Sequence, residues 1–350
     1  MSVPRASLAP GYTISRILKG GWQLAGGHGP VEMDAAVADM RAFVEAGITT
    51  FDCADIYTGV EALIGEFLRR LRADAGGAAA RRVQVHTKCV PDLDQLPTLS
   101  RHDIEAIVDR SLARLGVDAL NLVQLHWWDY RVPGWVEAAG WLDDLRKAGK
   151  IRLLGLTNFN VDRVREIAGA GVPVVSHQVQ YSVLDRRPAH GMTTTCGAHG
   201  IGLLAYGALA GGFLSERWLG QPAPPEPLEN RSLVKYRLII EEYGGWTAYQ
   251  ELLRALDAVA RKHGATIGAV GIRWVLDQPG VAGVIVGARH ARHLPETLSA
   301  ASVTLDEEDR ARIARAQEMA TGPAGDVYDL ERTPGGRHAV IMRYNLHKTG

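Results

Sequence analysis

Short apolar runs alternate with longer amphipathic segments along most of the chain. The apolar runs are mostly continuous, which is typical of parallel strands that are covered by helices. Eight of them are expected to form strands, at 14–22, 48–53, 82–88, 119–127, 151–159, 173–182, 201–206 and 281–288. Segments with helical spacing lie between them. Eight strand–helix units in succession predict a closed parallel (β/α)8 TIM barrel with its helices on the outside.

Several of the expected helices have recognisable ends. The segment 34–47 ends on Gly47, which suits the turn after a helix. The segment 100–116 opens with Ser100 and has Asp103 three residues later, which is close to a capping box. The segments 136–150 and 161–171 follow the same pattern.

Two regions break the alternation. Residues 214–246 form a long insertion whose "PAPPEP" core cannot sustain a helix, and loops of this length are usually functional or mobile. Residues 320–350 follow the last expected helix and are rich in Gly, Arg and His. We interpret both as long loops over one face of a single domain, 1–350. The barrel then spans about 14–303, after an N-terminal hairpin.

Composition narrows the class of protein. The 350 residues are 46% hydrophobic and 22% charged, with 39 basic and 39 acidic side chains, which argues against a cationic nucleic-acid binder. No apolar stretch is long enough to cross a bilayer, and the N-terminus lacks the pattern of a signal peptide. Three cysteines form neither a disulfide framework nor a CxxC pair. We therefore expect a cytoplasmic protein without nucleic-acid or membrane partners.

Polar side chains follow several of the expected strands. In a barrel of this class, active sites gather at the carboxyl ends of the strands. A group able to transfer protons or form hydrogen bonds lies at or near five successive strand ends: Asp52, Lys88, His126, Asn158 and Gln178. One such residue would mean little, but packing does not explain five at the same end.

Asp52, Tyr57, Lys88 and His126 suggest a specific chemistry. A free tyrosine has a pKa of about 10, and a nearby lysine cation favours the phenolate and lowers that pKa. Lys88 is therefore expected to lower the pKa of Tyr57, while Asp52 supplies the counter-charge that a buried lysine needs. His126 would sit across the site, hold a substrate oxygen and orient the carbonyl.

The motifs "FDCADIYTG", "VHTKC", "LVQLHWWD", "GLTNF", "SHQVQYSVLDRRP", "LLAYGAL" and "VIVGAR" occur in this order. Together they resemble the successive signatures of the aldo-keto reductase family, over nearly the whole chain. The resemblance implies a catalytic tetrad of Asp52, Tyr57, Lys88 and His126. It also implies hydride transfer between a nicotinamide cofactor and a carbonyl, with Tyr57 as proton donor in reduction, and a monomer as the default state.

The resemblance also implies a cofactor site at the carboxyl ends of the strands. Thr157, Asn158 and Gln178 would hold the nicotinamide amide, and Tyr206 would stack on its ring. The implied contacts along the rest of the cofactor are Gly21, Trp22, Asp52, Leu209, Gly211, Leu214, Val286, Gly287, Arg289, His293 and Thr297. No GxGxxG motif follows a strand, so a Rossmann unit is not supported.

The cofactor motifs depart from the family at two places. Relatives commonly have Asn where this chain has His177, between Ser176 and Gln178. Relatives with "GAR" often have Gln and Asn where this chain has His293 and Thr297. NADP(H) is favoured because Arg289 lies near a helix N-terminus and suits a phosphate, but NAD(H) stays open.

Other interpretations remain. A redox-sensing regulatory subunit with little turnover would carry the same residues, and Lys88 as a Schiff-base nucleophile would give an aldolase or lyase. The spacing of His86 and Cys89 does not fit a zinc motif, so no metal is expected. Trp22 and Trp127, with Tyr57 and His126, are expected to contact the substrate, a small aldehyde, ketone, sugar or alcohol. The histidines of the tail, His338 and His347, are expected to face solvent.

Overall fold

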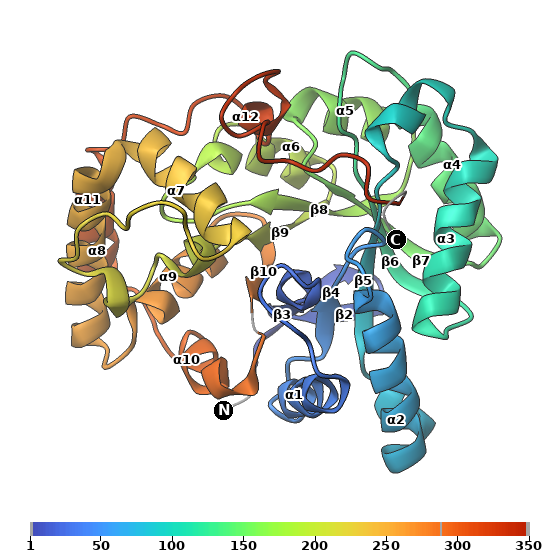
Figure 1. Ribbon diagram of the computed structural model, residues 1–350, viewed down its shortest axis with the longest axis horizontal. Coiled ribbons are helices and arrows are strands. Elements are labelled where there is room, and N and C mark those ends of the chain that lie inside the picture. Colours follow the sequence, from blue (N-terminus) through green and yellow to red (C-terminus); the bar gives the residue numbers. More distant parts are fainter. Residues whose placement is uncertain (1–2, 288, 348–350) are drawn as a thin grey trace.

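The computed structural model describes residues 3–287 and 289–347. Its centre is a closed barrel of eight parallel strands in the order β10-β3-β4-β5-β6-β7-β8-β9 (Figure 1). These strands are β3 (Ile17–Gly20), β4 (Thr50–Asp52), β5 (Gln84–Cys89), β6 (Leu120–Leu125), β7 (Ile151–Thr157), β8 (Val174–Gln180), β9 (Gly202–Tyr206) and β10 (Val281–Gly287). The predicted (β/α)8 barrel is confirmed, and each of the eight apolar runs supplies one barrel strand.

An antiparallel hairpin precedes the barrel, as expected. It consists of β1 (Arg5–Ala9) and β2 (Tyr12–Ser15). Leu8 and Ile14 of the hairpin pack into one apolar cluster with Val175 and Ala282, the second residues of β8 and β10. The expected strand 14–22 is therefore two strands, because β2 belongs to the hairpin and only β3 enters the barrel.

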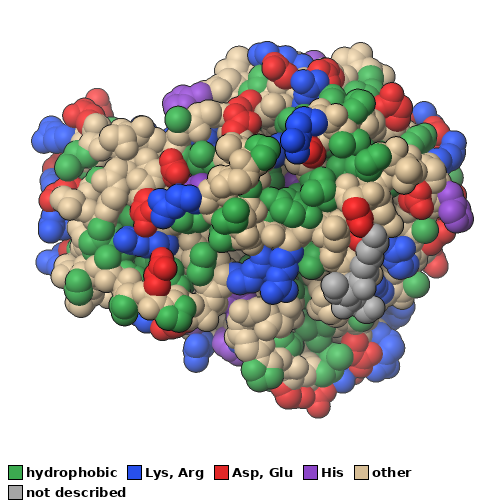
Figure 2. Space-filling view, turned by 45° about the horizontal axis from the view of Figure 1, so that its top comes forward, with side chains coloured by type: hydrophobic (Ala, Val, Ile, Leu, Met, Phe, Trp, Pro, Cys, Tyr) green, Lys and Arg blue, Asp and Glu red, His purple; other side chains and the backbone are tan. Residues whose placement is uncertain are grey.

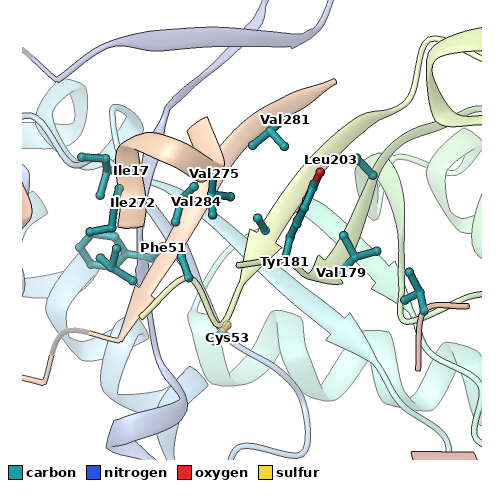
Figure 3. Packing of buried hydrophobic residues seen from close by; sticks show 14 of the residues in the cluster. Ile17, Phe51, Cys53, Val179, Tyr181, Leu203, Ile272, Val275, Val281 and Val284 are labelled. Carbon is teal, nitrogen blue, oxygen red and sulfur yellow. The ribbon is translucent and has the colours of Figure 1, made fainter. Parts of the chain in front are cut away.

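Helices surround the barrel (Figure 1). They are α1 (Met33–Glu45), α2 (Val60–Arg81), α3 (Arg101–Leu115), α4 (Trp135–Lys147), α5 (Val161–Gly169), α6 (Met192–Ala198), α8 (Gly245–Lys262), α9 (Ile267–Leu276), α10 (Leu294–Ser299) and α11 (Glu307–Gln317). Ser100 and Asp103 form the expected capping box of α3. The core lies between the two layers: Figure 3 shows Ile272 and Val275 of α9 beside Val284 of β10.

The insertion 214–246 is not a continuous loop. Its second half contains helix α7 (Arg231–Tyr243), and α8 already begins at Gly245. The side chain of Asn230 caps α7 by accepting a hydrogen bond of 3.0 Å from the backbone N–H of Leu233. The buried residues of α7 recur at helical spacing: Leu233, Tyr236, Ile239, Ile240 and Tyr243. The proline-rich core lies before this helix, so it does not prevent it from forming.

The tail crosses the face of the barrel where the strands end (Figure 1). We call residues 326–347 the strap; it contains helix α12 (Asp329–Arg332). The expectation that its histidines face solvent is wrong. His338 is 3% exposed, and His347 lies between the carboxylates of Asp55 and Asp92, 2.9 and 3.2 Å away.

Within the described residues, no helix combines the length and the apolar character that a membrane span requires.

Candidate active site

Strand register brings the expected catalytic residues to one rim of the barrel. Asp52 is the last residue of β4 and Lys88 the penultimate residue of β5, while His126 directly follows β6. Asp52 pairs with His86 and Lys88 with Gln124 across the ladders. Parallel strands in this order place the three side chains at neighbouring positions of the same end.

Lys88 and Asp52 form a buried ion pair. The Lys88 Nζ donates to Asp52 Oδ2 at 2.7 Å and to the carbonyl oxygen of Cys53 at 2.7 Å. Burial alone would lower the pKa of Lys88, but Asp52 and Tyr57 outweigh it, so the pKa ends above its ordinary value. Lys88 is therefore held as a cation. A Schiff-base nucleophile must be neutral, so this geometry disfavours the aldolase interpretation.

Tyr57 reaches the same place from the loop between β4 and α2. Its ring centroid lies 5.0 Å from Lys88 Nζ and 5.2 Å from the ring of Trp22, edge to face. Burial raises the pKa of Tyr57, while Lys88 lowers it and Asp52 raises it again. Lys88 thus acts in the expected direction, but the expected net lowering is wrong because desolvation of the phenolate is the larger effect.

His126 is neutral and has one nitrogen free for a substrate. Its Nδ1 lies 3.2 Å from the carbonyl oxygen of Thr157, which assigns the proton to Nδ1. Burial, with a contribution from Arg332, lowers the pKa of His126 to about 3. The Nε2 atom is buried and has no hydrogen-bond partner among the described residues. The lone pair on Nε2 is therefore suited to accept a hydrogen bond from a hydroxyl group.

Two glutamine side chains complete the surroundings of Asp52. Gln124 Nε2 donates to Asp52 Oδ1 at 3.1 Å, and Gln178 Nε2 donates to the same atom at 2.7 Å. Gln178 Nε2 also donates to Gln124 Oε1 at 2.9 Å. Gln124 was missed by the sequence analysis. Its position two residues before His126, on the same side of the strand, was the available signal.

The expected nicotinamide residues occupy the ends of β7, β8 and β9. Asn158 has a left-handed backbone, with φ of 62°, and its N–H donates to the carbonyl of Gln178 at 2.9 Å. The Tyr206 hydroxyl donates to Asn158 Oδ1 at 2.8 Å. The ammonium of Lys235, from α7, lies 5.2 Å from the centre of the Tyr206 ring. Thr157 is buried. Two amides and an aromatic ring at adjacent strand ends fit a nicotinamide carboxamide and its ring.

Packing also accounts for two of the expected glycines. A Cβ on Gly21 would lie 2.9 Å from the carbonyl oxygen of Asp52, and one on Gly211 would lie 2.8 Å from Tyr236. Gly211 also has φ of 65°. Leu214 is buried in the core, while Leu209 is partly buried.

The residues expected at the adenosine phosphate lie at the end of β10 and in the segment that follows it. The guanidinium of Arg289 donates to the carbonyl oxygens of His28 and Pro30. Val286 and Thr297 are buried and Gly287 and His293 are exposed, so His293 and Arg289 are the side chains best placed to meet a phosphate.

The two tryptophans after His126 are both buried and have different neighbours. Trp127 is 1% exposed and packs against Trp135, with its Nε1 donating to the carbonyl of Val132 at 2.9 Å. Trp128 instead lies beside the substrate-facing histidine, with its ring 4.2 Å from that of His126. Trp128 therefore has the ring contact with His126, and the expected substrate contact of Trp127 stays a prediction.

The cysteines and the surface add little chemistry. Cys53, Cys89 and Cys196 are buried free thiols, and burial raises the pKa of each. Within 3–287 and 289–347, no group of three His, Cys, Asp or Glu residues is arranged to hold a metal ion. Figure 2 shows Lys and Arg side chains gathered near the centre of the visible face, next to apolar side chains.

Known proteins share this architecture. The model of the aldo/keto reductase family matches residues 16–318. The chain is 31% identical over 261 residues to flagellar radial spoke protein 5 of Chlamydomonas reinhardtii, covering 64% of this chain and only 49% of that protein. It is 25% identical over 325 residues to the NADH-specific methylglyoxal reductase of Escherichia coli, covering 85% and 93% of the two chains.

A solved structure has the same fold. The glycerol dehydrogenase of Gluconobacter oxydans superposes with a TM-score of 0.77 at 23% identity, covering 93% of this chain and 98% of that one. The chain belongs to the aldo/keto reductase family and is an oxidoreductase that acts on carbonyl or alcohol groups.

Proposed function

We propose that the protein reduces an aldehyde or ketone to the alcohol, or catalyses the reverse oxidation, with a nicotinamide cofactor and with Tyr57 as the acid–base group. The observation that carries this proposal is the buried Lys88–Asp52 pair, 2.7 Å between Nζ and Oδ2, with the Tyr57 ring 5.0 Å from the same Nζ. A permanently charged lysine beside a phenol stabilises the phenolate that forms when the proton leaves.

Each residue of the tetrad has one task in this scheme. The cofactor, when bound, supplies or accepts the hydride. In reduction Tyr57 donates a proton to the substrate oxygen, and in oxidation the phenolate takes that proton back. Lys88 stabilises the phenolate electrostatically, and Asp52 keeps Lys88 charged and in place. Both roles depend on the ion pair staying buried.

His126 fixes the substrate oxygen. Its Nδ1–H is committed to the carbonyl of Thr157 at 3.2 Å. Its Nε2 can therefore accept a hydrogen bond but cannot donate one. Orienting a carbonyl, as expected from the sequence, would require a donor at Nε2, so we infer that His126 instead orients the hydroxyl form of the substrate, the alcohol. Trp22 and Trp128 would line the pocket on either side of Tyr57 and His126.

The cofactor residues that we propose follow the rim. Thr157, Asn158, Gln178 and Tyr206 would hold the nicotinamide, with Gly21, Trp22 and Asp52 beneath it. The remaining contacts would come from Leu209, Gly211, Leu214, Val286, Gly287, Arg289, His293 and Thr297. NADP(H) is favoured because a phosphate can replace the two carbonyl oxygens that Arg289 now contacts. NAD(H) remains the alternative, since one relative is named as NADH-specific.

A fluorescence titration with NADPH and NADH, followed by turnover of a carbonyl panel that includes 4-nitrobenzaldehyde, tests the proposal. We expect binding of at least one cofactor and oxidation of the reduced form with substrate. Tight binding without turnover across the panel would instead favour the redox-sensing regulatory subunit. No binding of either cofactor would overturn both.

A further inference from the structure

We propose that Gln124 is a positioning residue that orients the amide of Gln178 toward the carboxamide of the nicotinamide cofactor. This inference rests on the proposed function. It assigns to Gln124 the task of fixing which end of Gln178 faces the ligand, and it does not require Gln124 to touch the ligand.

The direction of the Gln124 amide is fixed by Asp52. The Gln124 side chain is fully buried, and its Nε2 donates to Asp52 Oδ1 at 3.1 Å and, more weakly, to the carbonyl of Thr87 at 3.4 Å. An ionised carboxylate only accepts hydrogen bonds, and so does a backbone carbonyl. The NH2 group of Gln124 must therefore face Asp52 and Thr87, which leaves its Oε1 as an acceptor on the other side.

The direction of the Gln178 amide follows from this. Gln178 Nε2 donates to Gln124 Oε1 at 2.9 Å and to Asp52 Oδ1 at 2.7 Å. An NH2 group has two hydrogens, and both are used by these two acceptors. If the Gln178 amide were turned over, its oxygen would face a carboxylate and an amide oxygen. Gln178 therefore presents Oε1, an acceptor, at the end that is left.

Packing leaves the Gln124 side chain little freedom to move. A Cβ placed on Gly155, the neighbour of Gln124 in the β6–β7 ladder, would lie 3.1 Å from Gln124 Cγ. Gly155 thus makes room for Gln124 in the barrel wall. A locked acceptor at Gln178 Oε1 suits the N–H group of a carboxamide, and it would repel a ligand that offers only oxygen atoms there.

Dissociation constants for two cofactors test this role without measuring turnover. The first is the cofactor preferred in the titration. The second is its 3-acetylpyridine analogue, in which a methyl ketone replaces the carboxamide, so the carbonyl is kept and the N–H group is lost. Gln124→Met keeps the length of the side chain and removes its hydrogen bonds with Asp52, Thr87 and Gln178. We expect this variant to bind the carboxamide cofactor about tenfold more weakly, which corresponds to roughly one lost hydrogen bond. Binding of the analogue should weaken less than about twofold.

Two further variants keep the test decisive. In Gln124→Glu a protonated carboxyl group can still donate to Asp52 and accept from Gln178, so we expect near-normal preference for the carboxamide. The double variant Gln124→Met/Gln178→Met should bind no more weakly than Gln178→Met alone, because both act on one contact. If Gln124→Met does not fold, Gln124→Glu decides. A retained preference for the carboxamide cofactor over the analogue supports the role of Gln124, and a lost preference overturns it.

The outcomes separate this inference from the proposed function. Equal weakening of both ligands by Gln124→Met, or no weakening of either, would overturn the role of Gln124 and leave the proposed function standing. Wild-type protein that binds no nicotinamide dinucleotide would overturn the proposed function, and this inference with it.

Discussion

The rim of the barrel and the cover above it are built on different principles. At the rim, Asp52, Lys88 and Gln124 lie on regular neighbouring strands and satisfy one another over 2.7–3.1 Å. The cover consists of α7 and the strap, and it is held by contacts between residues far apart in the chain. The rim fixes charges in place, whereas the cover lies over them and depends on long-range contacts.

Several contacts attach the strap, among them those of Glu331, Arg332 and His347. Glu331, fully buried, faces Lys235 at 3.3 Å and Arg187 at 3.9 Å. Arg332 Nη2 donates to the carbonyl of Trp127 at 2.7 Å. His347 lies between Asp55 and Asp92 at the far end. Just before these two residues, Tyr328 has a left-handed backbone, with φ of 66°, and its ring meets His126 edge-on at 5.5 Å.

Tyr57→Phe should have the largest effect, because it removes the proposed proton donor and leaves the cover unchanged. We expect kcat to fall by about 10²–10⁴-fold, the usual contribution of general acid–base catalysis, with cofactor affinity within about twofold of wild type. Single-turnover kinetics and a fluorescence titration measure the two quantities. The distinction between rim and cover would be contradicted if Tyr328→Phe, the same substitution in the strap, lowered kcat equally.

Lys88→Met tests whether the rim is also a structural element. Asp52 would be left as a buried carboxylate without its cation, which costs about 3–5 kcal/mol in comparable cases. Denaturant unfolding should show a large fall in stability, and hydride transfer should be lost. Lys150→Met, at partly exposed ion pairs with Glu105 and Asp109, is the matched control and should change stability little. Equal losses in the two variants would argue against a special role for burial.

Glu331→Gln should loosen the cover and spare the rim. The variant removes a buried negative charge between Lys235 and Arg187, so we expect the strap to open more often, by roughly tenfold. Hydrogen exchange of residues 326–347 should be faster, while exchange of β5 and β6 stays unchanged. If the strand peptides lose protection to the same extent, the strap is part of the barrel's cooperative unit.

Sequence reasoning succeeds where the structure depends on local patterns. The eight barrel strands, the capping box of Ser100 and Asp103, and the convergence of Asp52, Lys88 and His126 all follow from periodicity and from the topology of parallel strands. It failed at α7, whose apolar stripe was overlooked beside the "PAPPEP" segment. It also failed for His347, because the contacts with Asp55 and Asp92 join residues 292 and 255 positions apart, and no local pattern encodes them.

The sequence also cannot weigh opposing contributions to one pKa. The effect of Lys88 on Tyr57 was predictable from their chemistry, but the larger effect of burial depends on how the neighbouring loops pack. The same applies to Trp127 and Trp128. Their order in the sequence shows that they point in different directions, but only the fold shows that Trp127 packs against Trp135 and Trp128 against His126.

His347 should make the attachment of the strap depend on pH, the smallest effect that we expect. Burial lowers its pKa, but the facing carboxylates Asp55 and Asp92 outweigh burial and the more distant Arg110, so the pKa is raised. A raised folded-state pKa stabilises the folded form fully below the unfolded value of about 6.5. That stabilisation disappears as the pH rises through the pKa of the folded state.

Hydrogen-exchange protection of residues 340–347, corrected for the intrinsic pH dependence of exchange, measures this effect. In wild-type protein we expect protection to fall as the pH rises from 6 to 9. In His347→Gln it should be lower throughout and independent of pH, because the ion pairs with Asp55 and Asp92 are gone. His199→Gln, at an exposed position on the barrel, is the control and should behave as wild type. A His347→Gln strap that keeps the wild-type pH profile would show that some other titrating group holds this end of the chain.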